Sequence, residues 1–127
     1  MSIKIKSIAR KNLQDQAAPP KYYAIVEPSG KTDIDELSAL IADKSTVSRP
    51  DVYAVILATL ETVIKELQAG RSVHLGKLGS FGISINSDPV DTADAVSSTI
   101  VKKARVVYRP GPEIKNMLKV LKYEKKS

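Results

Sequence analysis

The sequence contains no cysteine, no tryptophan and a single histidine, His74. Without thiolates the chain can form neither disulfides nor cysteine-based zinc and iron sites, and this lack of cysteine suits a reducing cytoplasm. One imidazole is too few for the usual histidine metal centre. No window approaches the roughly 18 consecutive apolar residues that a membrane span needs. The basic N-terminus, residues 1–12, has no apolar block, so we expect no signal peptide.

Groups that could build an active site are missing as well. As an acid–base catalyst His74 would need a partner, yet residues 70–81 contain no acid. The glycines between 76 and 82 lie between two predicted strands rather than before a helix, so they do not form a dinucleotide loop. The aspartates of residues 88–94 recur every third position, whereas a calcium loop needs acids at alternate positions. We therefore predict a protein that is not an enzyme, with no catalytic residue, cofactor or small-molecule substrate.

What the sequence has is an uneven distribution of charge. The net charge of +6 comes from 20 basic and 14 acidic residues. Residues 102–127 contain nine bases and two acids, and residues 1–31 contain six bases and two acids, while the segment between them is acidic. Segments polarised in this way create a positive field on the surface they share, which favours polyanionic partners.

The first 31 residues predict a pair of strands. Residues 2–10 alternate isoleucine with lysine, and residues 21–27, KYYAIVE, are rich in aromatic and β-branched side chains. A connector with two prolines, residues 14–20, separates them. Because a lone strand pair is marginally stable, we expect this N-terminal β extension to join the sheet of residues 32–127, within a single domain overall.

Two helices follow. Thr32 or Asp33 can cap the first, and Glu36 lies three residues after Asp33. Ser48, with Asp51 three residues later and Pro50 in the first turn, begins the second, over about Pro50 to Ala69. The second helix carries a wide apolar stripe, formed by Val52, Tyr53, Ile56, Leu57, Leu60, Val63, Ile64 and Leu67. This stripe is wider than a surface helix usually buries. It predicts a homodimer that covers it with a second copy, and the alternative is a central helix in a monomer core.

The stretch from Gly70 to Ile85 organises the chain, because it predicts a glycine-bounded hairpin fed by the long helix. An acidic excursion, residues 86–98, leads to a strand at Thr99 to Tyr108, with Lys103 and Arg105 on one face and Lys102 on the other. A final helix is expected from Pro112. Its inner face is expected to include Ile114, Met117, Leu118 and Leu121, with lysines at 115, 119, 122, 125 and 126 on the remainder.

Two segments resemble the bacterial histone-like HU/IHF family. GRSVHLGKLGSF at 70–81 is similar to the family's helix-to-sheet signature, and YRPGPEIKNMLK at 108–119 is similar to its aromatic, base and glycine segment. With residues 1–31 added, the chain looks like the Bacteroidetes-type variants that carry an N-terminal extension. The resemblance implies an α+β fold: an intertwined homodimer with a helical base under a β-sheet saddle and two β-arms. It also implies cytoplasmic, nucleoid-associated binding of double-stranded DNA along the minor groove, where arm-tip prolines wedge into the base stack.

The resemblance and the charge pattern together nominate eight DNA-binding bases. Lys77 matches a turn position near DNA, and Arg109 matches the base that follows the aromatic residue. The full set is Arg71, Lys77, Lys102, Lys103, Arg105, Arg109, Lys115 and Lys119. Each of them could instead be an ordinary solvated surface cation.

The arm of this chain departs from the family pattern. The family's arm is strongly basic and ends in an arginine-asparagine-proline tip, whereas residues 86–98 are shorter and acidic, with Pro89 as their proline. Phosphates repel such an arm, so the saddle and the last helix are expected to supply the attraction. A largely sequence-nonspecific architectural protein is the first hypothesis. The alternative is the same fold used as a protein-interaction or structural module with weak or no DNA binding.

Overall fold

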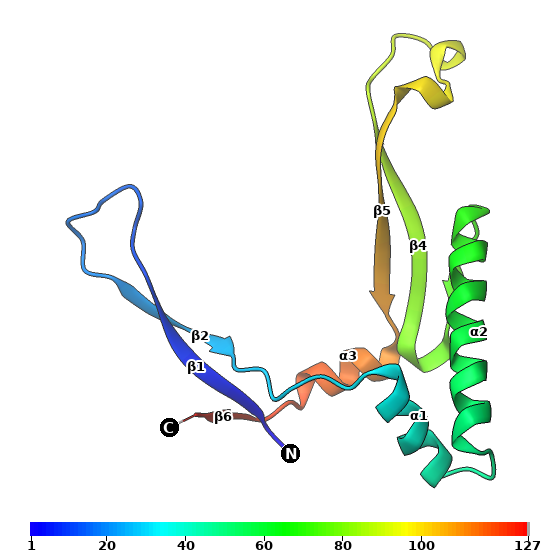
Figure 1. The fold of residues 1–127 in the computed structure, drawn as a ribbon. Coiled ribbons are helices and arrows are strands. Elements are labelled where there is room, and N and C mark those ends of the chain that lie inside the picture. Colours follow the sequence, from blue (N-terminus) through cyan, green and yellow to red (C-terminus); the bar gives the residue numbers. More distant parts are fainter. Residues whose placement is uncertain (127) are drawn as a thin grey trace. The chain divides into compact units, whose positions relative to one another are not determined.

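The computed structural model describes residues 1–126 and divides into two units, each of which is described by itself. One unit is Ile34–Asn116, and the other combines Met1–Asp33 with the segment from Met117 onward. Figure 1 shows the elements along the chain. In order they are β1 (Ile3–Arg10), β2 (Lys21–Val26), α1 (Ile34–Asp43), α2 (Arg49–Gln68), β3 (Val73–His74), η1 (Gly76–Leu78), β4 (Gly79–Ser87), η2 (Ala93–Ala95), η3 (Ser98–Ile100), β5 (Val101–Pro110), α3 (Pro112–Lys119) and β6 (Tyr123–Lys125).

The helices α1 and α2 lie where the capping residues predicted them. The Ser48 hydroxyl accepts a hydrogen bond from the Asp51 amide at 3.4 Å, which satisfies one of the free amides of the first turn of α2. Arg49 and Asp35 join the two helices through an ion pair of 2.9 Å. The acid in the first turn of α1 thus serves both the helix dipole and the contact with α2.

The strands β3, β4 and β5 form an antiparallel sheet in that order. The strands β4 and β5 pair from Gly79↔Pro110 to Ser87↔Val101 and make a long two-stranded arm. The predicted strand at 99–108 is confirmed with shifted bounds, because residues 98–100 form a short 3-10 turn. The helix α2 runs beside β4 in Figure 1, and the end of the arm lies beyond the paired region.

The acidic excursion is structured rather than open. The Asp88 amide donates a 3.0 Å hydrogen bond to the Ile100 carbonyl and closes the base of the loop. Pro89 follows this bond directly, and the two short turns η2 and η3 lie beyond it. The proline therefore lies where the loop begins, next to the last closed pair of the arm.

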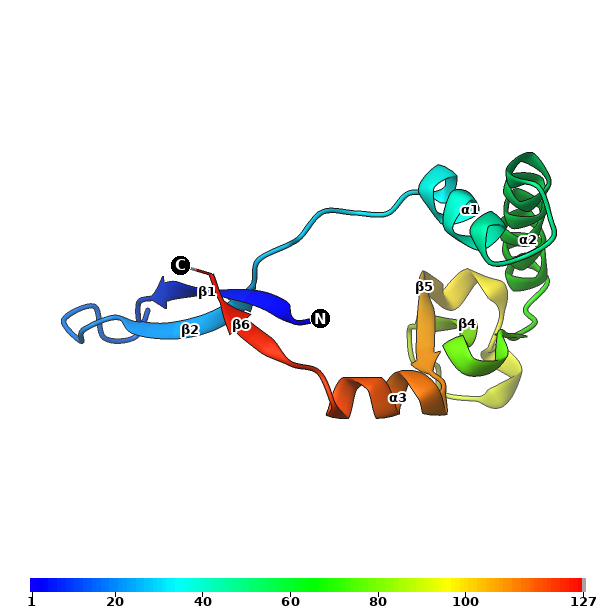
Figure 2. The ribbon, with the colours of Figure 1, turned by 90° about the horizontal axis from the view of Figure 1, so that it is seen from below.

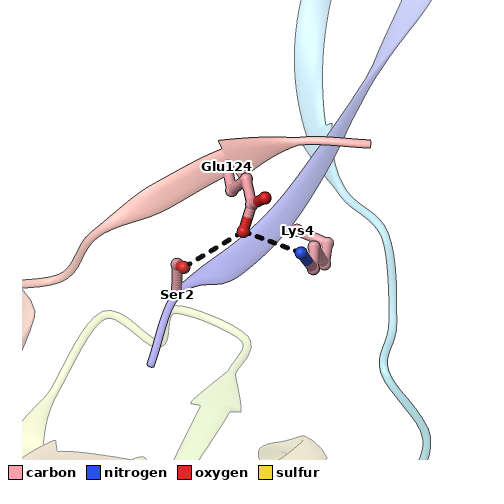
Figure 3. Close-up of polar contacts among 3 residues, drawn as sticks. All are labelled: Ser2, Lys4 and Glu124. Carbon is pink, nitrogen blue, oxygen red and sulfur yellow. Dashed lines mark hydrogen bonds and ion pairs between the residues drawn. The ribbon is translucent and has the colours of Figure 1, made fainter. Parts of the chain in front are cut away.

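The strands β1 and β2 form their own sheet, in the order β2-β1-β6, rather than adding to β3-β4-β5 (Figure 2). The expected helix through Lys126 is wrong at its end: α3 stops at Lys119, and Tyr123–Lys125 is a strand parallel to β1. Figure 3 shows the contact that secures it, in which Glu124 Oε2 accepts from Lys4 Nζ at 2.7 Å and from Ser2 Oγ at 3.4 Å. The Lys4 hydrogen bond and charge lower the pKa of Glu124.

Little of the chain is buried. Among residues 1–126, Val52 is the one hydrophobic side chain that is buried, and Ser38 is the one polar side chain. Ser38 donates its hydroxyl to the Ile34 carbonyl at 2.7 Å, so its burial leaves no polar group unsatisfied. A single copy thus leaves most of its large apolar side chains in contact with solvent.

Candidate nucleic-acid interface

The β4–β5 arm has two chemically different faces. Cross-strand partners share a face, and successive residues of a strand alternate between faces. One face combines Phe81 with Tyr108, whose ring centroids lie 5.0 Å apart, and continues through Ile83 and Val106. The opposite face combines Ser80 with Arg109, Gly82 with Val107, Ser84 with Arg105 and Asn86 with Lys103. The second face is therefore polar and basic at every one of these pairs except Gly82 with Val107.

A shallow hollow of about 450 Å³ lies on the polar face. The strand β3 contributes His74, which pairs with Ser80 in the register, and the His74 Nε2 lies 3.2 Å from the Ser72 hydroxyl. The lining also includes Arg105 and Arg109. Hydroxyls, an imidazole and two guanidinium groups thus converge on one open surface, which suits a charged ligand far larger than the hollow.

Within residues 1–126, the three bases of this face are not neutralised by an acidic side chain. Among residues 1–126, no acidic side chain lies within ion-pair distance of Lys103, Arg105 or Arg109. The alternate positions 103, 105, 107 and 109 of β5 lie on this face, and all of them are basic except Val107. A row of exposed cations at this spacing repels itself, so a polyanion that neutralises the row gains Coulombic energy. The predicted placement of Lys103 and Arg105 on one face is confirmed.

The structure separates Lys102 from this row. The register of the arm shifts between Asn86 and Ser87, so Lys102 has no cross-strand partner of its own. Its Nζ lies 2.7 Å from the Asp88 carboxylate. Lys102 is thus the additional residue of a β-bulge, and its charge is paired with Asp88, unlike the charges of Lys103, Arg105 and Arg109.

The other nominated bases lie outside the row, in segments that precede and follow β4 and β5 in the chain. Arg71 follows α2 and pairs with Glu66 at 2.9 Å, and Lys77 in the η1 turn pairs with Glu113 of α3 at 3.4 Å. Both side chains are exposed, so these pairs are worth little and another anion can replace the acid. Lys115 and Lys119 lie on α3, four residues apart and so on one face of that helix.

The polar partners on β4 were not among the nominated residues. Ser80, Ser84 and Asn86 lie opposite the three bases, and their hydroxyl or amide groups can donate to the same ligand. The signal is present in the sequence, because small or polar residues alternate with Phe81, Ile83 and Ile85. The alternation that predicts the strand therefore also indicates what its other face offers.

A close packing of two glycines fixes the root of the arm. Gly79 has φ +124°, and an added Cβ would collide with the Arg109 carbonyl oxygen and lie 2.8 Å from the Gly111 nitrogen. At Gly111 an added Cβ would in turn meet the Lys77 carbonyl. The Gly111 amide also donates to the Leu78 carbonyl at 3.3 Å. The two segments at 70–81 and 108–119 are therefore in direct contact, backbone against backbone.

A family model described as "HU domain fused to wHTH, Ig, or Glycine-rich motif" matches residues 1–125. The chain belongs to this HU-HIG family. The match includes both sheets and all three helices of the HU-HIG chain, so the N-terminal strands are part of the family pattern. The recognised resemblance to histone-like HU proteins is confirmed at the level of the family and of an α+β fold.

Two solved structures are similar to this HU-HIG chain. A protein from Bacteroides vulgatus, named as a bacterial DNA-binding protein, matches with a TM-score of 0.66 and 17% identity over 98% of this chain and 48% of that chain. The chain thus spans about half the length of that protein, and at this identity the likeness is one of fold. The Anabaena HU–DNA cocrystal matches with a TM-score of 0.49 and 24% identity over 68% of this chain and 97% of that one. No curated protein matches the sequence.

Within residues 1–126 of the HU-HIG chain, no group of three or more His, Cys, Asp or Glu side chains is arranged to hold a metal ion. In the same part of the chain, none of the helices combines the length and the apolar character needed to cross a membrane.

Proposed function

We propose that this protein is a non-enzymatic, largely sequence-nonspecific binder of double-stranded DNA that acts as a histone-like homodimer in the nucleoid. The observation that carries this proposal is the row of unpaired cations Lys103, Arg105 and Arg109 on the polar face of the arm. Membership of a family defined by an HU domain supports it. So does the DNA-binding name of the Bacteroides neighbour, whose fold this chain shares.

The chemistry of the face favours phosphate contacts over base reading. Lysine and arginine neutralise phosphates, and the released counterions supply affinity that does not depend on sequence. Serine hydroxyls opposite the bases add short hydrogen bonds to the same oxygens, because Ser80 and Ser84 pair with Arg109 and Arg105. The other nominated residues would act as secondary phosphate contacts. They are Arg71, Lys77, Lys102, Lys115 and Lys119.

An unpartnered stripe on α2 supports the homodimer. Tyr53, Leu57, Leu60 and Ile64 follow the spacing i, i+4, i+7, i+11 and remain exposed, with Ile64 at 59% and Leu60 at 43%. That spacing is the seam of a two-helix packing, which one copy leaves open. Packing this seam against a second copy would remove apolar surface from water and place two basic arms in one particle.

The acidic tip argues for binding along the arms rather than wedging between bases. Asp88, Asp91 and Asp94 surround the loop that Pro89 begins. Carboxylates brought against a phosphate backbone add repulsion, so the attraction comes from the β5 cations and from α3. We therefore propose weak bending, which a gel-shift comparison of linear, nicked and cruciform duplexes tests, because proteins that kink DNA prefer substrates that are already distorted.

The decisive experiment measures duplex affinity against salt for the unchanged protein and for the Lys103→Glu/Arg105→Glu variant. The unchanged protein is expected to lose affinity steeply as salt rises. The variant is expected to bind weakly with a shallower salt slope, lower by about 0.9 for each phosphate that it no longer neutralises. Lys102→Glu reverses one charge on the adjacent residue, half the charge change of the double variant, and we expect its loss of affinity to be less than half of that of the double variant on a free-energy scale. A salt-independent affinity, or no binding at low salt, contradicts the proposal.

A protein-interaction or structural role for the same fold is the second candidate. The acidic tip motivates it, since the Asp91 and Asp94 carboxylates in the loop of the arm suit a basic protein surface better than a duplex. Unchanged DNA retention in the Lys103→Glu/Arg105→Glu variant favours this candidate over DNA binding.

A further inference from the structure

The strand β2 presents an open edge. It is the outer strand of the sheet β2-β1-β6, and in the described chain no strand lies on its other side. All of its side chains except that of Ile25 are exposed, including Tyr22 at 70% and Val26 at 57%. Proteins usually protect such edges with a proline, a bulge or an inward charge, but the sequence from Tyr22 to Val26 contains neither proline nor charge.

The backbone groups at this edge can be assigned from the pairing with β1. The Glu27 amide donates to the Lys4 carbonyl at 2.8 Å, so alternate residues back along β2 direct their amides and carbonyls toward β1. Tyr22, Ala24 and Val26 lie at the intervening positions and direct theirs outward. The middle of the open edge is therefore Ala24, with one outward residue two positions away on each side.

The segment KYYAIVE, residues 21–27, is complementary to itself in an antiparallel arrangement. When Ala24 faces Ala24 of a second copy, Tyr22 faces Val26 and Tyr23 faces Ile25. Lys21 then faces Glu27 at both ends, so the two charges of the segment meet opposite charges. In an antiparallel pair of β2 strands, residues with outward backbone groups must face one another, and the register centred on Ala24 meets this condition. It is also the register that places Lys21 opposite Glu27, so the charges and the hydrogen-bond phase agree on it.

We propose that β2 pairs with β2 of a second copy of this chain, antiparallel and centred on Ala24, to make a continuous six-stranded sheet. Tyr22 and Val26 would pair across the junction on one face, as aromatic and β-branched residues favour. On the other face Lys21 would reach the Glu27 carboxylate, which has lone pairs left beside its ion pairs to Lys6 and Lys126. This interface is separate from the α2 stripe and does not depend on DNA binding.

Disulfide trapping tests the register directly, because the chain has no cysteine of its own. In the Ala24→Cys variant of the full chain, the two Cα atoms would lie about 5.5 Å apart, within the range a disulfide spans. Ser7→Cys is the matched control, since Ser7 is the cross-strand partner of Ala24 in β1 and shares its face. The two Ser7 positions would be three strand spacings apart, about 14 Å.

Under mild oxidation, we expect a disulfide-linked dimer as the main product of Ala24→Cys and as a minor product of Ser7→Cys. Equal amounts of linked dimer from the two variants, or none from either, overturn the proposal. Non-reducing electrophoresis at several protein concentrations gives the readout.

Charge reversal tests the self-complementarity without cysteine. Lys21→Glu places a glutamate opposite Glu27 at both ends of the junction, and we expect association weakened by about tenfold in sedimentation velocity. Lys11→Glu makes the same charge change in the loop after β1 and is expected to sediment like the unchanged protein. If Lys21→Glu also sediments like the unchanged protein, the pairing is wrong, whatever the DNA-binding result.

Discussion

The Tyr108 hydroxyl donates a 2.6 Å hydrogen bond to the Leu78 carbonyl, thirty residues earlier in the chain. This bond ties β5 to the η1 turn, while the Tyr108 ring contacts Phe81 on the apolar face of the arm. One side chain therefore holds the turn, the strand and the hydrophobic face together. The neighbouring Arg109 and the Lys77 turn take their positions from this root.

Tyr108→Phe removes the hydroxyl and keeps the ring. We expect a loss of about 1 kcal/mol in the free energy of unfolding, the usual net value of one hydrogen bond. Urea unfolding followed by circular dichroism measures it. Tyr53→Phe is the control, because no hydrogen bond of the Tyr53 hydroxyl is found within residues 1–126, and its stability is expected to be unchanged. Equal stabilities of the two variants would show that the 2.6 Å contact contributes nothing.

Gly79→Ala places a methyl group into the Arg109 carbonyl at a backbone angle that other residues avoid. We expect a loss of at least about 2 kcal/mol from strain and collision together. Gly82→Ala, on the same strand, meets no atom within 4 Å and should change stability by less than about 0.5 kcal/mol. Thermal unfolding of both variants is the measurement, and a Gly79→Ala protein as stable as Gly82→Ala contradicts the packing at the root of the arm.

Leu60→Ala distinguishes a covered stripe on α2 from an exposed one. In a homodimer that buries Leu60, the substitution is expected to cost about 2–5 kcal/mol per subunit. In a monomer, where Leu60 stays 43% exposed, the expected cost is far smaller. Urea unfolding at several protein concentrations separates the cases, because the midpoint of a dimer rises with concentration. A concentration-independent midpoint with a small loss in Leu60→Ala would rule out the dimer seam.

The ion pairs of Glu27 lead us to expect that the sheet β2-β1-β6 loses stability in acid. A hydrogen bond from Lys6, the Lys6 charge and the nearby Lys126 lower the pKa of Glu27. A carboxyl group whose pKa is lower in the folded than in the unfolded chain stabilises the fold at pH values above its pKa in the unfolded chain, about 4.3. That contribution is lost as the pH falls through the pKa of the folded chain. NMR amide signals of β1 and β2 between neutral pH and about pH 3 should report the loss.

In the Glu27→Gln variant we expect this acid-dependent loss to be absent, with a lower stability at neutral pH. Glu61→Gln on α2 is the control, and its acid profile should match that of the unchanged protein. If all three proteins lose the β1 and β2 signals at the same pH, the contacts of Glu27 with Lys6 and Lys126 do not stabilise the sheet.

Local patterns in the sequence predicted the elements of Ile34–Asn116 well. Capping by Ser48 and the periodicity of α2 located the helices, and alternation along β5 correctly placed Lys103 and Arg105 on one face. These features depend on residues near in sequence or on the strict two-residue period of a strand. The same alternation placed Lys102 on the other face, but the register shift that leaves Lys102 without a cross-strand partner could not be foreseen, because it depends on how the Asp88 loop closes.

The end of α3 was missed for a related reason. Leu121 continues the helical spacing of Met117 and Leu118, so the periodicity alone carries the helix past Lys119. The chain instead leaves the helix and forms β6 against β1, where Ile3 pairs with Tyr123. That choice depends on a strand more than a hundred residues away, and no window of the sequence contains both partners.

The register shift near the end of β4 has a geometric consequence. An additional residue in one strand bends the ladder and increases its right-handed twist. Going from the Gly79–Pro110 pair toward the loop of the arm, Arg109, Arg105 and Lys103 lie before this bend, and the aspartates of residues 88–94 lie after it. A straight double helix that lay parallel to the first segment would therefore not be parallel to the segment that carries the aspartates.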